Sequence, residues 1–131
     1  LAGMRAVMAI ERELGFTPRD RSADNCGYDI ESVVPDELHA KGPALRMIEV
    51  KGRTAGATTV TVSHNEVMCA LNRPDAFVLA LVEVDGNTTR TSYIAHPFTS
   101  PPDYAAASTN YDIERLKEAG DVILEREQEW Q

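Results

Sequence analysis

Two stretches of sequence decide the predicted fold: YDIESVV at residues 28–34 and ALRMIEVKG at residues 44–52. Both alternate apolar and polar residues, which is typical of β-strands with one face on a core. In the second stretch, Glu49 and Lys51 lie two residues apart, so their side chains project from one face while their apolar neighbours point to the other. We predict that the two stretches pair as an antiparallel ribbon.

Helices and further strands are predicted along the rest of the first 98 residues. Residues 4–15 carry apolar side chains at helical spacing and end at Gly15. Ser63 and Glu66 form the S-x-x-E pattern that begins a helix. The predicted elements are a helix at 4–15, strands at 28–34, 44–52 and 58–63, a helix at 63–71, and strands at 76–84 and 88–98. This order predicts an α/β fold in which helices flank a mixed β-sheet.

The C-terminal residues 99–131 have a different pattern. A stretch rich in proline and alanine at 99–108 is typical of a linker, and residues 112–130 show a weak helical pattern that is interrupted at Gly120. We predict a linker and an acidic helical tail that packs on, or extends from, a domain formed by residues 1–98.

Length and composition indicate one ordinary soluble domain. The chain has 131 residues, of which 43% are hydrophobic and 26% charged. It lacks both a membrane-spanning apolar stretch and a signal-peptide pattern, so we expect a cytoplasmic protein. The net charge of -8 argues against broad nucleic-acid binding, but residues 103–131 supply most of it, with eight acidic and three basic side chains. Scattered cysteines and histidines give no zinc-binding pattern.

The predicted ribbon brings three charged side chains together. Asp29, near the start of the first strand, comes opposite the end of the second strand, where Glu49 and Lys51 lie. The two carboxylates and the backbone carbonyl of Val50 are hard oxygen ligands of the kind that Mg²⁺, or Mn²⁺, prefers. Lys51 is suited to orient or deprotonate a water molecule and to stabilise charge on a phosphate. We therefore take Asp29, Glu49 and Lys51 as candidate catalytic residues for phosphodiester hydrolysis.

A fourth acidic residue, Glu11, falls within the apolar stripe of the first helix rather than on its polar face. One interpretation is that Glu11 lies at the edge of the stripe and reaches water. The other is that this unusual position for a carboxylate reflects a functional role.

The helix glutamate, GYDI at 27–30, IEVKG at 48–52 and NE at 65–66 together resemble a known family. Over roughly residues 4–98, the chain is similar to the C-terminal domain of the plant NO VEIN protein and its bacterial relatives. That domain is grouped with the PD-(D/E)xK, restriction-endonuclease-like superfamily. The resemblance implies a restriction-endonuclease-like core, with one mixed sheet flanked by helices.

The resemblance also assigns roles to individual residues. It places Asp29, Glu49 and Lys51 at the D…E-x-K positions of the superfamily, and Glu11 at the helix acid that many of its nucleases add to the metal site. The proline of the PD dipeptide is absent, since Tyr28 precedes Asp29. Such domains are attached to helicase or other ATPase modules in bacterial restriction, phage-defence and DNA-processing proteins. Because this chain begins at Leu1 rather than at a methionine, we expect it to be part of such a longer protein.

Three further residues are candidates for substrate binding. Arg53 follows Lys51 closely, and the resemblance places Asn65 and Glu66 at the rim of the site. Glu66 has an alternative role, since the capping box accounts for it without any function. Aromatic residues make up only 6% of the chain, so an aromatic platform for base stacking is not expected.

These patterns favour a magnesium-dependent nuclease domain that hydrolyses DNA phosphodiester bonds. The alternative is a catalytically inactive module with the same fold that binds DNA or a protein, in which the acidic tail would be the interaction surface. A hydrolase of small phosphorylated molecules finds no support in the sequence, because neither a Walker-type glycine loop nor a nucleophile elbow is present.

Overall fold

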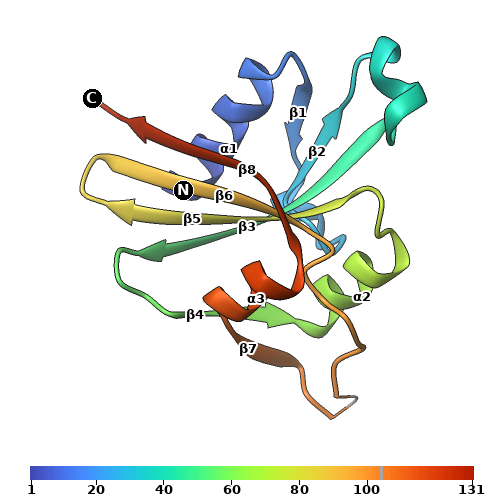
Figure 1. Ribbon diagram of the computed structural model, residues 1–131, viewed down its shortest axis with the longest axis vertical. Helices are drawn as coiled ribbons and strands as arrows, with labels where there is room; N and C mark the ends of the chain where they lie inside the picture. The colour runs from blue at the N-terminus through green and yellow to red at the C-terminus, as the bar shows by residue number, and fades with distance from the viewer. Residues whose placement is uncertain (104) are drawn as a thin grey trace.

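The computed structural model describes residues 1–103 and 105–131 and shows a twisted sheet with helices on both of its faces (Figure 1). The helices are α1 (Ala2–Glu13), α2 (His64–Asn72) and α3 (Ile113–Ala119), and two short 3-10 helices are η1 (Ser22–Asp24) and η2 (Asp36–Lys41). The strands are β1 (Thr17–Asp20), β2 (Ile30–Val33), β3 (Leu45–Thr54), β4 (Thr59–Ser63), β5 (Phe77–Asp85), β6 (Thr88–Ala95), β7 (Ser108–Asp112) and β8 (Asp121–Glu129).

Six of these strands form the main sheet, in the order β1-β2-β3-β5-β6-β8. Strands β3 and β5 are parallel, because the chain crosses over through β4 and α2 between them, and every other neighbouring pair is antiparallel. The predicted ribbon of β2 and β3 is confirmed, with Ile30 opposite Ile48. The predicted α/β fold with a mixed sheet flanked by helices is also confirmed.

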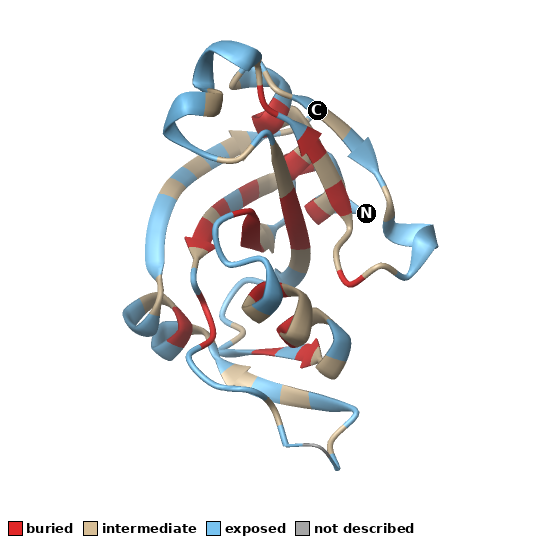
Figure 2. Ribbon diagram, turned by 90° about the vertical axis from the view of Figure 1, so that its right-hand side faces the viewer, coloured by how far each residue is buried: buried red, intermediate tan, exposed pale blue. Residues whose placement is uncertain are grey.

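The main sheet has a hydrophobic core on each face, and its central strand β5 is buried along most of its length (Figure 2). On one face, α1 packs on the sheet and covers Ile48. On the other face, α2, β4 and α3 pack on Leu79 and Leu81 of β5. Since side chains alternate along β3, Glu49 and Lys51 project toward the α2 face while Ile48 and Val50 project toward α1. The alternation in this one strand therefore decides on which face of the sheet Glu49 and Lys51 lie.

Two strands differ from the predicted arrangement. Residues 17–20, which are not among the predicted elements, form the short edge strand β1. β4 does not join the main sheet; it pairs with β7, with Val60 opposite Tyr111. Its apolar side chains Val60 and Val62 belong to the core on the α2 face. The alternation identified β4 as a strand, but the partner that completes its ladder lies almost fifty residues further along the chain.

The predicted helical tail is wrong for most of its length. Helix α3 follows the helical pattern, but residues 108–112 and 121–129 are strands, and β8 is the sixth strand of the main sheet. Backbone pairing with β6 overrides the weak helical pattern of this segment, since β6 would otherwise be an open edge. Gly120 permits the turn from α3 into β8, because a Cβ there would lie 2.6 Å from Ile94 Cγ2. The predicted linker at 99–108 includes residue 104, which lies outside the described residues.

No helix in residues 1–103 and 105–131 combines the length and the apolar character needed to cross a bilayer.

Candidate functional site

Asp29 lies directly before β2 and faces β3. Its backbone N–H donates to the carbonyl oxygen of Ile48 at 2.9 Å, and its carboxylate Oδ2 accepts the N–H of Val50, also at 2.9 Å. In an extended strand, the N–H and C=O groups of one residue point to the same side. The Val50 carbonyl therefore also projects toward the Asp29 side of β3. The structure thus brings the carboxylate of Asp29 and the backbone of Val50 together.

Glu49 and Lys51 meet a third side chain, Glu66, on the α2 face of the sheet. The Lys51 ammonium Nζ lies 3.2 Å from Glu49 Oε2 and 2.9 Å from Glu66 Oε1. Glu49 is almost fully buried, with 3% of its side chain exposed, whereas about one fifth of each of the other two side chains is exposed. We call Asp29, Glu49, Lys51 and Glu66 the carboxylate–lysine cluster.

Glu66 reaches this cluster from the first turn of α2. The predicted capping box is present, since Glu66 N donates to Ser63 Oγ at 3.1 Å and Ser63 N donates to Glu66 Oε1 at 2.9 Å. The S-x-x-E pattern found Glu66 as a cap, but its contact with Lys51 depends on how α2 packs on β3. The separation of Lys51 and Glu66 along the chain therefore does not predict that contact.

The cluster shifts the pKa values of its members. Burial is the main reason that the pKa of Glu49 rises to about 9, and the negative charges of Asp29 and Glu66 raise it further against the opposing effect of Lys51. Burial favours the neutral amine of Lys51, but its contacts with Glu66 and Glu49 outweigh that effect and raise its pKa. The contacts of Glu66 with Lys51 and Ser63 likewise outweigh burial and lower its pKa. At neutral pH, Glu49 is therefore a neutral acid beside an ammonium and a carboxylate.

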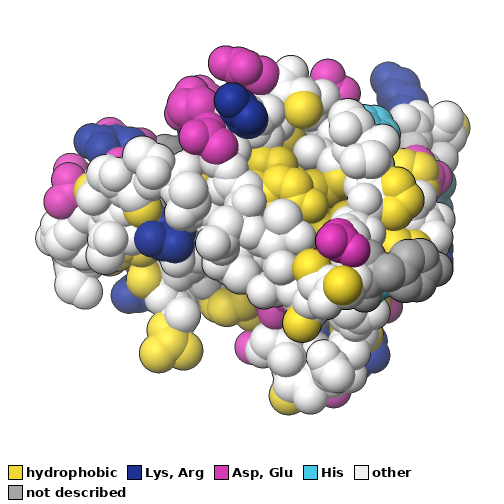
Figure 3. Space-filling model, turned by 90° about the horizontal axis from the view of Figure 1, so that it is seen from below, with side chains coloured by type: hydrophobic (Ala, Val, Ile, Leu, Met, Phe, Trp, Pro, Cys, Tyr) yellow, Lys and Arg dark blue, Asp and Glu magenta, His cyan; other side chains and the backbone are white. Residues whose placement is uncertain are grey.

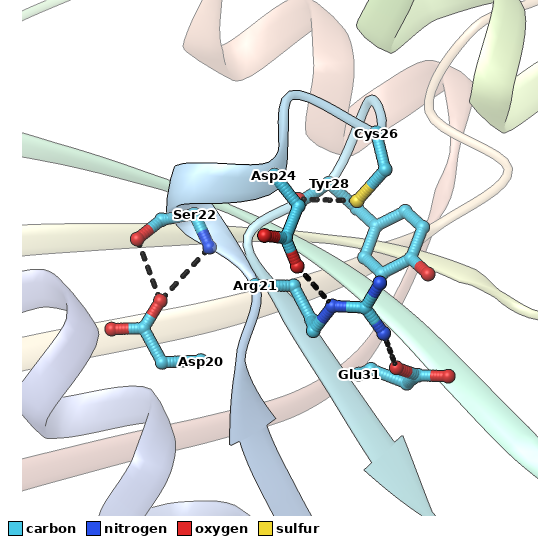
Figure 4. A network of polar contacts seen from close by, with 7 residues as sticks. All are labelled: Asp20, Arg21, Ser22, Asp24, Cys26, Tyr28 and Glu31. Carbon is cyan, nitrogen blue, oxygen red and sulfur yellow. Dashed lines mark hydrogen bonds and ion pairs between the residues drawn. The ribbon is translucent and has the colours of Figure 1, made fainter.

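The loop that leads to Asp29 is held from both sides. Arg21 bridges Asp24 and Glu31 by ion pairs (Figure 4), and its backbone N–H donates to the carbonyl oxygen of Asp29 at 2.7 Å. Gly27 has a left-handed backbone (φ +90°), and a Cβ there would lie 3.1 Å from Cys69 Cβ of α2. A side chain at position 27 would be strained and would push the loop away from α2. The approach of this loop to α2 therefore depends on glycine.

Glu11 lies apart from the cluster, on the opposite face of the sheet. It is fully buried, accepts a hydrogen bond from the Tyr93 hydroxyl at Oε2 (2.9 Å) and forms an ion pair with Arg46 Nε at Oε1 (3.3 Å). The Arg46 guanidinium also lies over the rings of Phe16 and Tyr93. Glu11 does not reach water, as the edge-of-stripe interpretation required, and the structure does not bring it to Asp29 or Glu49. Glu11, Arg46 and Tyr93 form a buried network of polar contacts beneath α1.

The family model described as "Protein NO VEIN, C-terminal" matches residues 1–94. The chain belongs to this family. No curated protein and no solved structure matched the chain.

The NO VEIN C-terminal match runs from α1 into β6, so all four members of the carboxylate–lysine cluster lie within it. Strands β7 and β8 and helix α3 lie outside it. The cluster is thus built by the family domain, and the C-terminal residues add a sixth strand to its sheet and a second layer over its α2 face.

A groove of about 570 Å³ extends from Lys51 across the C-terminal end of β3 to α3. One side comes from the NO VEIN C-terminal domain and the other from the C-terminal segment. Arg53 lines the groove and is exposed, and its side chain makes no hydrogen bond or ion pair with any described residue. Asn65 is exposed on α2 beside Gly27 rather than beside Lys51. Of the three predicted substrate-binding residues, the structure thus places Glu66 within the cluster, Arg53 along the groove that starts there, and Asn65 outside both.

The donor types around Asp29 fit a hard divalent cation. The carboxyl groups of Asp29 and Glu49, the latter once it has lost its proton, and the backbone carbonyl of Val50 are oxygen ligands of the kind that Mg²⁺ takes while keeping several waters. Among the described residues, no three Asp, Glu, His or Cys side chains form a ready-made metal-binding group. An ion held here would therefore complete its coordination with backbone oxygen, water and substrate.

The raised pKa of Glu49 predicts a pH-dependent cost to stability. Glu49 is neutral in the folded protein up to a pH of about 9, but its ordinary pKa is 4.5, so the folded state binds more protons than the unfolded state between those values. The free energy of unfolding should therefore fall as the pH rises from about 5 to 9. We expect Glu49→Gln, without added metal, to raise the free energy of unfolding by roughly 2 kcal/mol at pH 8 and by much less at pH 5.

Urea denaturation of both proteins at the two pH values measures this difference. Glu37→Gln, which changes an exposed glutamate of η2, is the matched control and should leave stability unchanged at both. A Glu49→Gln protein that is less stable than the wild type at pH 8 would show that Glu49 is ionised and favourably paired in the fold.

Proposed function

We propose that this NO VEIN C-terminal domain is a nuclease that hydrolyses DNA phosphodiester bonds with Mg²⁺ or Mn²⁺. The observation that carries the proposal is the convergence of Asp29, Glu49 and Lys51 beside the Val50 backbone. The mixed sheet flanked by helices supports the further assignment of the fold to the PD-(D/E)xK, restriction-endonuclease-like superfamily.

The residues of the cluster divide the chemistry between them. Asp29, Glu49 and the Val50 carbonyl are the groups that would hold the cation. A bound divalent cation neutralises phosphate charge and lowers the pKa of a coordinated water. Lys51 carries a full positive charge, because its contacts with Glu66 and Glu49 raise its pKa. We therefore assign Lys51 to stabilising negative charge on the phosphate rather than to accepting a proton.

Recognition of DNA would depend on backbone contacts and on partners. On the face drawn in Figure 3, the described Lys and Arg side chains are scattered among acidic ones and form no continuous basic patch. Arg53 extends the positive charge of Lys51 along the groove. We therefore propose that an attached or associated helicase or ATPase module supplies most of the affinity. The parent would be a bacterial restriction, phage-defence or DNA-processing protein that acts on DNA in the cytoplasm.

One observation favours the second candidate, an inactive module that binds DNA or a protein. Lys51 is held by the side chains of Glu49 and Glu66, and Glu11 is bound by Arg46 and Tyr93 on the far face. Internal ion pairs of this kind are also what a domain that kept its fold and lost its activity would show.

Metal titration combined with a cleavage assay tests the proposal. We expect calorimetry to show Mg²⁺ and Mn²⁺ binding at millimolar concentrations or below, and we expect metal-dependent cutting of plasmid or single-stranded DNA in the same buffers. EDTA should abolish the cutting. The assay should also be repeated with the parent protein, since a domain that depends on an attached helicase or ATPase module cuts DNA only in that context. Absence of metal binding, with and without DNA, would refute the nuclease and leave the binding module.

A further inference from the structure

We propose that Glu66 is the positioning residue of this site and that it holds Lys51 in place beside Glu49 from the first turn of α2. The inference rests on the proposed function for its role in catalysis, but the contact itself is independent of that function. This role differs from the position at the rim of the site that the family resemblance implies, because Glu66 contacts the candidate catalytic residue Lys51 directly.

The geometry of one oxygen atom carries the argument. Glu66 Oε1 receives both Lys51 Nζ and the backbone N–H of Ser63, each at 2.9 Å. The second of these bonds fixes the carboxylate to the start of a helix, where Ser63 Oγ in turn accepts the N–H of Glu66. A lysine side chain is long and flexible, so one anchored partner restricts where its ammonium lies. The other partner, Glu49, is buried on β3. The ammonium is therefore held between a strand and a helix.

Helix α2 orients the other side of the site as well. The backbone oxygen of Asn65, the residue before Glu66, lies 3.3 Å from the position that a Cβ of Gly27 would take. Gly27 is two residues before Asp29, so the same turn of α2 that anchors Lys51 also supports the loop that carries Asp29. A displacement of this turn would separate Lys51 from Asp29. A misplacement of about 1 Å costs on the order of 100-fold in rate at a catalytic site.

Two crossed substitutions separate the positioning role from the helix cap. Glutamine at the third position of a capping box still accepts the N–H of the cap residue, so Glu66→Gln keeps the helix start and removes the charge that holds Lys51. Ser63→Ala damages the cap but leaves both partners of Glu66 Oε1 in place. We expect Glu66→Gln to lower kcat for metal-dependent cleavage about 10- to 100-fold with KM within about twofold, and Ser63→Ala to keep kcat within about twofold.

A second readout does not require activity. The side-chain ammonium of Lys51, followed by NMR on protein labelled with ¹⁵N, should be ordered and protected from hydrogen exchange in the wild type and in Ser63→Ala. It should lose both properties in Glu66→Gln. If neither the domain nor its parent protein cuts DNA, the proposed nuclease fails while this measurement still decides the anchoring of Lys51. An unchanged Lys51 signal in Glu66→Gln, or an equal loss of kcat in both variants, would overturn the proposal.

Discussion

Asp29→Asn should lose Mg²⁺ binding and metal-dependent cleavage by more than about 100-fold, since even the loss of a group that only orients a ligand typically costs 10- to 100-fold. Asparagine removes the negative charge that a hard cation requires. It keeps an oxygen that accepts the Val50 N–H now bound by Asp29 Oδ2, so the β2–β3 ribbon should remain folded. Calorimetry and DNA cleavage, each against the wild type, measure the two losses.

The matched control for this substitution is Asp36→Asn. It removes the same charge from a side chain that is fully exposed on η2, so the net charge of the two variants is equal. We expect Asp36→Asn to bind metal and cut DNA as the wild type does. Wild-type metal affinity in Asp29→Asn would show that the cation, if it binds at all, is held elsewhere.

Glu11→Ala should destabilise the fold by about 3 kcal/mol and leave the metal site intact. The substitution removes the ion-pair partner of Arg46, which is only 17% exposed, and the acceptor of the buried Tyr93 hydroxyl. An uncompensated charge and an unpaired hydroxyl would then remain beneath α1. Urea denaturation measures the loss, and calorimetry under conditions where the variant is folded measures its Mg²⁺ affinity.

Glu13→Ala, at an exposed position on the same helix, controls for helix propensity and for charge and should be nearly neutral. A folded Glu11→Ala protein of wild-type stability that had lost its Mg²⁺ affinity would contradict the placement of Glu11. It would also restore the metal-ligand role that the family resemblance implies for this residue.

Local patterns were sufficient for much of the architecture. The alternation in 28–34 and 44–52 predicts β2, β3 and the face on which Glu49 projects, because the two-residue period of a strand is a property of the backbone itself. The capping box at Ser63 predicts the start of α2 for a similar reason, since its two hydrogen bonds join residues three apart. Such features need no knowledge of distant partners.

Longer-range features were decided by tertiary structure. The helical period of α1 shows that Glu11 lies in the apolar stripe, but only the packing of α1 on the sheet shows that Arg46 and Tyr93 are its partners. Residues 121–129 have a weak helical pattern but form β8. Pairing with the open edge of β6 supplies backbone hydrogen bonds within a packed sheet, whereas a short helix with little apolar surface is only marginally stable.

The cluster itself shows the same division. The sequence determined that Glu49 and Lys51 share one face of a strand and that Asp29 precedes its neighbour, because these relations follow from strand geometry and antiparallel pairing. Only the tertiary structure placed Glu66 on Lys51 and Glu11 on the far side of the sheet. Both placements depend on which face each helix covers, and the crossover and packing that decide this involve contacts between residues far apart in the chain.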